Sequence, residues 1–184
     1  SAIAMFSSLI SSPSYNISVA SPSPISGIVS VGNQTTLIAV AVQNNSNSEK
    51  AELVGISFRK YGTANTLNLK NLTLYDGSII VYRYDGGFGT WAPFNNTGWR
   101  VGPKSTKVLT LKADTSSFNN GDTLKMALES IDSVNIRTIA GVSFSPSLTQ
   151  AWPVNGDTLT FSSAYTLTVS KSSSGSGTVT SSPA

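Results

Sequence analysis

Apolar residues alternate with small or polar residues along much of the chain. The clearest runs are residues 15–19, 54–58, 124–128 and 165–169, where every second residue is apolar. Strict alternation of this kind is typical of strands that expose one face. Residues 35–44 ("TTLIAVAVQN") are apolar on both faces, which indicates a central strand, and residues 106–114 predict another strand.

Turn signals separate these runs. Asp76-Gly77 and Asp85-Gly86 place an Asp-Gly pair where a tight turn requires positive φ, and "NGDTL" leads into a strand from Asn120 and again from Asn155. No window has a helical period. We therefore predict an all-β chain of about ten strands, folded as an antiparallel β-sandwich of immunoglobulin-like or jelly-roll-like type.

The two ends of the chain differ from its middle. "SPSPI" at residues 21–25 is an extended Ser-Pro linker, because proline biases the preceding residue toward extended geometry. The sequence therefore predicts an N-terminal extension at residues 1–24, a sandwich domain at 25–170 and a Ser/Gly-rich tail at 171–184.

The extension carries apolar side chains that fit a strand donated to a neighbouring copy. Such a strand adds main-chain hydrogen bonds to a sheet edge and places alternate side chains in pockets. The candidate donor residues are Ile3, Met5, Leu9, Tyr15, Ile17 and Val19. The same sequence around Tyr15 equally fits the first strand of the chain's own sandwich, and which end of the chain is donated stays open.

An N-terminal extension before an all-β body resembles the layout of donor-strand-exchange filament subunits, such as the chaperone–usher pilins and other prokaryotic β-sandwich filament proteins. Residues 165–184 ("YTLTVSKSSSGSGTVTSSPA") resemble a repeat common in large bacterial secreted and surface proteins. Both resemblances imply an extracellular or cell-surface, non-catalytic protein. The first implies a homopolymer, with copies of the chain itself as partners.

Residues 86–99 ("GGFGTWAPFNNTGW") hold four aromatic side chains, Phe88, Trp91, Phe94 and Trp99. On an exposed loop they would suit a subunit interface or stacking against a glycan. Their spacing is irregular, and a sandwich needs large side chains to fill its interior. We expect packing as their main role, with a carbohydrate-binding or adhesin module of a larger secreted surface protein as the alternative function.

Composition removes several function classes. The chain lacks cysteine and histidine, so it has no thiolate metal site, disulfide or Ser-His-Asp triad. Charged residues make up 11% and the net charge is +3 without a basic cluster, which argues against nucleic-acid binding. No apolar run has the ~20 residues of a membrane span. A charge-poor, Ser/Thr-rich surface favours secretion, and we expect no cofactor, no metal and no enzymatic activity.

Two weaker features complete the sequence. Residues 114–122 ("DTSSFNNGD") are rich in oxygen ligands, but an EF-hand would need an acid where Lys125 stands, so an Asx-rich turn fits better than a looser calcium site using Asp114, Asn119, Asn120 and Asp122. Sequons for N-glycosylation occur at five positions, about as many as chance predicts. They begin at Asn16, Asn33, Asn44, Asn71 and Asn95.

Overall fold

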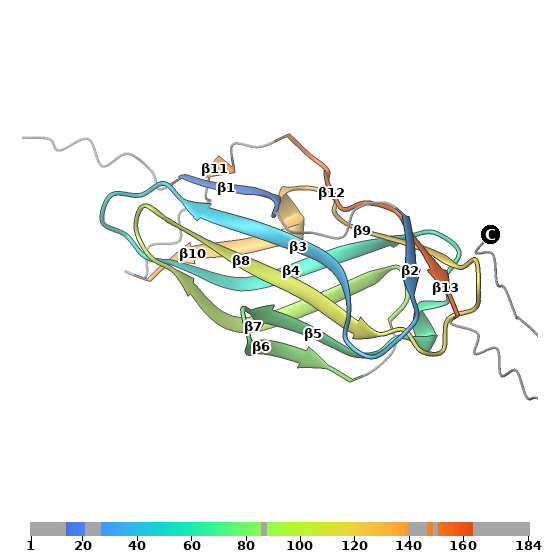
Figure 1. Cartoon of the computed structure of the whole chain (residues 1–184). Coiled ribbons are helices and arrows are strands. Elements are labelled where there is room, and N and C mark those ends of the chain that lie inside the picture. Colours follow the sequence, from blue (N-terminus) through green and yellow to red (C-terminus); the bar gives the residue numbers. More distant parts are fainter. Residues whose placement is uncertain (1–13, 21–26, 86–87, 140–146, 149–150, 164–184) are drawn as a thin grey trace, which may run out of the picture.

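The computed structural model describes residues 14–20, 27–85, 88–139, 147–148 and 151–163, which form two β-sheets packed face to face (Figure 1). The first sheet has six strands. In order across the sheet they are β11 (Ser147–Leu148), β1 (Ser14–Val19), β3 (Thr35–Asn44), β8 (Ser105–Asp114), β5 (Lys70–Asp76) and β6 (Ile79–Tyr84). The predicted all-β sandwich is therefore confirmed.

The second sheet has seven strands. Its main order is β10 (Val134–Thr138), β4 (Ala51–Tyr61), β9 (Thr123–Leu128), β13 (Leu159–Ser162) and β2 (Gly27–Ser30). Strand β7 (Trp91–Val101) pairs with β4, and β12 (Val154–Asn155) pairs with β9. Two parallel pairings, β1 with β11 and β2 with β13, make the otherwise antiparallel sheets mixed.

Short 3₁₀ turns η1 (Thr66–Asn68) and η2 (Ile131–Ser133) are the helical elements of the described residues. None of the helices there has the length and apolarity that crossing a membrane requires. The predicted Asp76-Gly77 turn is present between β5 and β6, with Gly77 at φ 60° in the left-handed region. Residues 86–87, which hold the second predicted Asp-Gly turn in part, lie outside the described residues.

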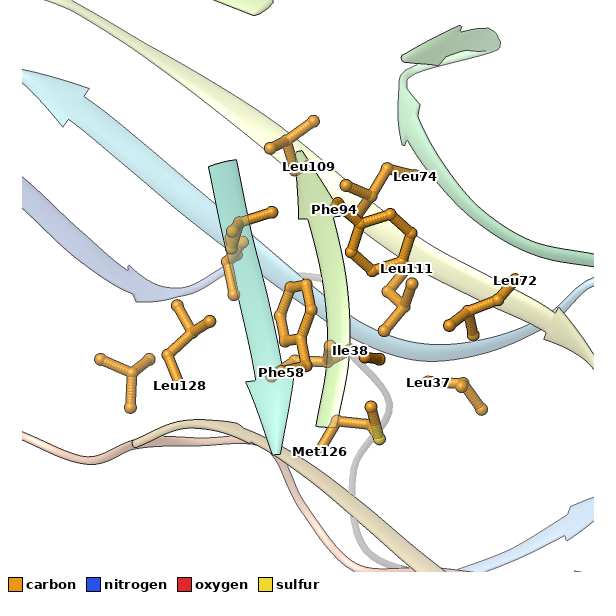
Figure 2. Close-up of a cluster of buried hydrophobic side chains, with 14 of the residues drawn as sticks. Leu37, Ile38, Phe58, Leu72, Leu74, Phe94, Leu109, Leu111, Met126 and Leu128 are labelled. Atoms are coloured by element: carbon orange, nitrogen blue, oxygen red, sulfur yellow. The ribbon is translucent and has the colours of Figure 1, made fainter. Parts of the chain in front are cut away.

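The inner faces of both sheets form one hydrophobic core. Figure 2 shows Phe58 of β4 and Phe94 of β7 among leucines of the opposite sheet, including Leu109 and Leu111 of β8. The two phenylalanine rings meet edge to face with their centroids 6.2 Å apart. Each fully buried side chain of this size stabilises the fold by ~1.5–3 kcal/mol.

Residues 14–19, predicted as part of the N-terminal extension, lie in the first sheet of the same chain. In Figure 1, β1 (blue) runs beside β3, whereas β2, the next strand along the chain, lies beside β13 in the second sheet. Residues 164–184, with the predicted strand at 165–169, lie outside the described residues.

Candidate functional site

Strand β1 occupies one side of β3 and contributes to the core. It pairs antiparallel with β3 from Tyr15 opposite Asn44 to Val19 opposite Val40. Alternation turns Tyr15, Ile17 and Val19 toward the core face, and the first two are buried to 1% and 0% exposure. The seat of β1 on β3 is the candidate functional site for strand donation.

The backbone of β1 is bonded at both of its ends. The amide of Ala20 donates to the carbonyl of Ala39 over 2.8 Å, and the amide of Asn45 donates to the carbonyl of Ser14 over 3.0 Å. On its other side, within the described residues, β1 pairs with the two residues of β11 in parallel. The β3 edge therefore supplies most of the main-chain bonds that hold β1.

One polar atom in this seat is unsatisfied. The hydroxyl of Tyr15 is buried and has no hydrogen-bond partner among the described residues. Burial, together with a smaller effect from the charge of Glu49, raises the pKa of this hydroxyl above its ordinary value. An unpaired buried hydroxyl costs about 1–3 kcal/mol, so the seat holds β1 less tightly than its apolar contacts alone would.

The six candidate donor residues fall into three groups. Tyr15 and Ile17 are core residues, and Val19, near the end of β1, is 39% exposed. The remaining three, Ile3, Met5 and Leu9, lie outside the described residues.

The chain between β1 and β2 passes from one sheet to the other. Residues 21–26, outside the described part, make this connection. The seven Cα–Cα steps from Ala20 to Gly27 reach at most ~25 Å when fully extended.

Most of the aromatic segment lies in strand β7 and not on an exposed loop. Phe88, Phe94 and Trp99 are buried to 4%, 0% and 6% exposure, while Trp91 remains 43% exposed. Packing is thus the role of three of the four side chains, and burial removes those three from any glycan contact. The irregular spacing arises because β7 carries a bulge: Asn96 and Gly98 have positive φ, and the register with β4 shifts between Leu53 and Gly55.

A polar clamp joins the two sheets beside Trp99. The indole nitrogen of Trp99 donates to the Asp76 carboxylate over 2.9 Å, and Lys107 Nζ lies 2.6 Å from the same Oδ2 atom. Desolvation pushes the pKa of Asp76 upward, but these two hydrogen bonds outweigh it and hold that pKa below its ordinary value. The clamp fixes β7 of one sheet against β5 and β8 of the other.

A second polar cluster lies on the outer face of the second sheet. The Arg59 guanidinium carbon lies 5.1 Å from the Tyr61 ring centroid and 5.7 Å from that of Trp91. Lys125 Nζ lies 4.7 Å from the Tyr61 centroid. The Glu129 carboxylate accepts hydrogen bonds from Arg59, over 3.0 Å, and from the Tyr61 hydroxyl. We call Arg59, Tyr61, Trp91, Lys125 and Glu129 the aromatic–cation row.

Farther along the same face, one carboxylate is shared by two guanidinium groups. Glu52 of β4 accepts from Arg100 of β7 at 3.1 Å and from the Nε of Arg137 of β10 at 3.1 Å. The hydrogen bonds from Arg137 and then Arg100 lower the pKa of Glu52. The side chains of the two arginines are 60% and 57% exposed, so this group adds positive charge to the surface.

The five sequons differ in accessibility. Asn33, Asn71 and Asn95 are exposed and Asn16 is half-buried. Asn44 is fully buried, and its Nδ2 donates to the carbonyls of Glu49 and Val101 over 2.8 and 3.2 Å. The Asn44 amide is therefore out of reach of a modifying enzyme in the folded chain, and glycosylation at the other four stays a prediction.

The oxygen-rich segment uses its side chains for turns. Asp114 Oδ1 accepts from the amide and hydroxyl of Ser116, and Asp122 Oδ2 accepts from the amide of Asn119 over 2.8 Å. Asn120 is exposed beside them. Within the described ranges, no three Asp, Glu, His or Cys side chains gather as they would around a metal ion.

Sequence reasoning missed the aromatic–cation row because it depends on register. Arg59 faces Trp91 across β4 and β7, and Tyr61 faces Lys125 across β4 and β9. The available signal was the alternation in β4, which places Arg59 and Tyr61 on the face opposite the core residue Phe58.

Comparison of the chain with protein-family models and with curated proteins finds no match.

Proposed function

We propose that the protein is a non-catalytic structural subunit of an extracellular filament or cell-surface assembly, which polymerises head-to-tail by donating β1 to the next copy. The observation that carries the proposal is the position of β1. It supplies buried core residues to the first sheet, and residues 21–26 link it along the chain to β2 of the second sheet.

Exchange of β1 would conserve every contact of its seat. The β1 strand of a neighbouring copy offers the same Tyr15 and Ile17 side chains and the same backbone bonds to β3. Such a swap requires the connection between β1 and β2 to run to a neighbouring copy instead of back to its own chain. Because each copy both gives and receives a strand, the contact propagates as a filament when it does not close into a ring.

The energetics favour an occupied seat over an empty one. An empty seat exposes Val40 and Val42 of β3 and leaves the main-chain groups of its edge unpaired. Burial of Tyr15 and Ile17 contributes ~1.5–3 kcal/mol each. A copy whose β1 is displaced from its own β3 should therefore bind the β1 of another copy.

The surface is consistent with an extracellular location. Charged residues are 11% of the chain, against about 25% in an average globular domain. The layout resemblance to strand-exchanging filament subunits supports the same role.

Negative-stain microscopy tests the proposal with three samples. The intact chain should form filaments, and a chain beginning at Ile25 should not. The shortened chain mixed with a peptide of residues 1–20 should give stable, monodisperse particles, because the peptide fills the seat without linking copies. An intact chain that stays monodisperse under all assembly conditions tested would contradict the proposal.

A further inference from the structure

Trp91 is an exposed aromatic residue beside a cluster of side chains that bond to one another. It lies at the start of β7, and 43% of it is accessible to solvent. The other members of the aromatic–cation row are held in place by one another, through the Arg59–Glu129 ion pair of 3.0 Å and the Tyr61–Glu129 hydrogen bond. A site whose side chains are already ordered loses little conformational entropy when a ligand binds.

The charge of this face is positive but sparse. In the described part of the chain, Arg59 pairs with Glu129, and Arg100 and Arg137 share Glu52, while Lys125 lies over the Tyr61 ring. Each arginine already faces one of these carboxylates. Nucleic-acid binders instead neutralise runs of closely spaced phosphates with many unpaired cations. The excess of positive charge on this face suits a polymer that carries carboxylates.

We propose that the outer face of the second sheet binds an acidic, carboxylate-bearing polysaccharide, with Trp91 as its stacking platform. The apolar face of a sugar ring stacks on the exposed indole, since aromatic side chains combine a large apolar surface with directional contacts. Lys125 and the exposed arginines attract carboxylates of neighbouring sugar units. This site lies on the sheet opposite β1, so it functions whether or not β1 is exchanged.

The proposal is tested with polygalacturonate and its methyl-esterified form, which share one backbone and differ in charge. Calorimetry at low ionic strength should show binding to polygalacturonate, and weaker binding to the ester. Trp91→Ala should weaken binding by at least about tenfold, as expected for a central aromatic anchor. Lys125→Gln should weaken it by roughly threefold and reduce its salt dependence.

Two variants on the other sheet serve as matched controls. Tyr84 of β6 is also an exposed aromatic residue, and Lys112 Nζ also lies over a tyrosine ring, 5.3 Å from the Tyr75 centroid. Tyr84→Ala and Lys112→Gln should leave binding unchanged. Thermal unfolding checks that Trp91→Ala remains folded.

Three results would overturn the proposal. They are no binding to polygalacturonate at low ionic strength, an equal loss in the Tyr84→Ala control, and tighter binding of a single-stranded oligonucleotide than of polygalacturonate. Loss of self-assembly in Trp91→Ala with unchanged sugar binding would assign the face to contacts between copies instead, and would also contradict it.

Discussion

The two sides of β3 hold partner strands of different kinds. On one side, β8 pairs with β3 from Ser105 to Ala113 and is joined to the sandwich at both of its ends. On the other side, β1 pairs over five residues, and the next strand along the chain, β2, lies in the second sheet. Both strands bury apolar side chains in the same core. The proposed donation of β1 therefore rests on how β1 is connected along the chain, and not on a difference in side-chain chemistry.

Large-to-small substitutions on the two sides should have the largest effect and should differ in their rescue. Ile17→Ala and Leu109→Ala each remove a fully buried side chain, so each should lower the free energy of unfolding by about 2–5 kcal/mol, as measured by denaturant titration. A peptide of residues 1–20, added in trans, should restore stability to Ile17→Ala alone. Equal rescue of both variants, or rescue of neither, would contradict the proposed difference between the two sides of β3.

Asn44 tests the end of β3 where the two partner strands meet. It lies opposite Tyr15 on one side and Ser105 on the other, and its buried amide donates to two carbonyls. Asn44→Ala should cost about 1–3 kcal/mol, because it leaves buried carbonyls without donors. The exposed sequon Asn95→Ala is the control and should change the melting temperature little. An Asn44→Ala variant with an unchanged free energy of unfolding would show that these hydrogen bonds do not stabilise the fold.

The polar clamp belongs to the β8 side and should make the fold sensitive to acid. Since the Asp76 pKa is lowered in the folded state, its contribution is present above the unfolded pKa and is lost as pH falls through the folded pKa. Asp76→Asn should lower the free energy of unfolding by about 1 kcal/mol at neutral pH. The loss is small because the Asp76–Lys107 ion pair is partly exposed to solvent. The substitution should also flatten the decline of stability below about pH 4. If stability depended on pH in the same way in Asp76→Asn and in the unmodified protein, the proposed role of the clamp in acid sensitivity would be wrong.

Tyr15→Phe should have the smallest effect and the opposite sign. Removal of a buried hydroxyl that has no partner among the described residues should leave stability unchanged or raise it by up to about 1 kcal/mol. Thermal unfolding provides the measurement, and Tyr82→Phe, on a half-buried tyrosine of β6, is the control. A loss of more than 1 kcal/mol in Tyr15→Phe would mean that the hydroxyl is bonded.

The pattern of apolar residues predicted the strands in which that pattern is uninterrupted. Residues 35–44 coincide with β3, and the alternation of residues 54–58 falls within β4. It missed β7, because the bulge around Asn96 puts Phe94 and Trp99, five residues apart, on the same face. Alternation cannot reveal a strand whose period is broken by an inserted residue.

The candidate sites were predictable only as far as they depend on local pattern. The apolar alternation of Tyr15 and Ile17 was readable, whereas the identity of their acceptor strand was not, because it is a long-range pairing. The aromatic–cation row likewise depends on the register of three strands, which no local signal fixes.

A designed disulfide between β1 and β3 tests strand donation most directly. Ser18 and Ala41 are paired, outward-facing positions of an antiparallel hydrogen-bonded pair, whose Cα separation of about 5.5 Å suits a disulfide. The chain has no cysteine of its own, so only the introduced pair reacts. A control pair at Gln43 and Thr106 links β3 to β8.

Both double-cysteine variants are assembled, oxidised and examined on a denaturing gel without reductant. If β1 is donated, Ser18→Cys/Ala41→Cys gives a ladder of covalent multimers, while Gln43→Cys/Thr106→Cys gives a single band of cross-linked monomer. A single monomer band from assembled Ser18→Cys/Ala41→Cys would show that β1 stays in its own chain, and would contradict the account.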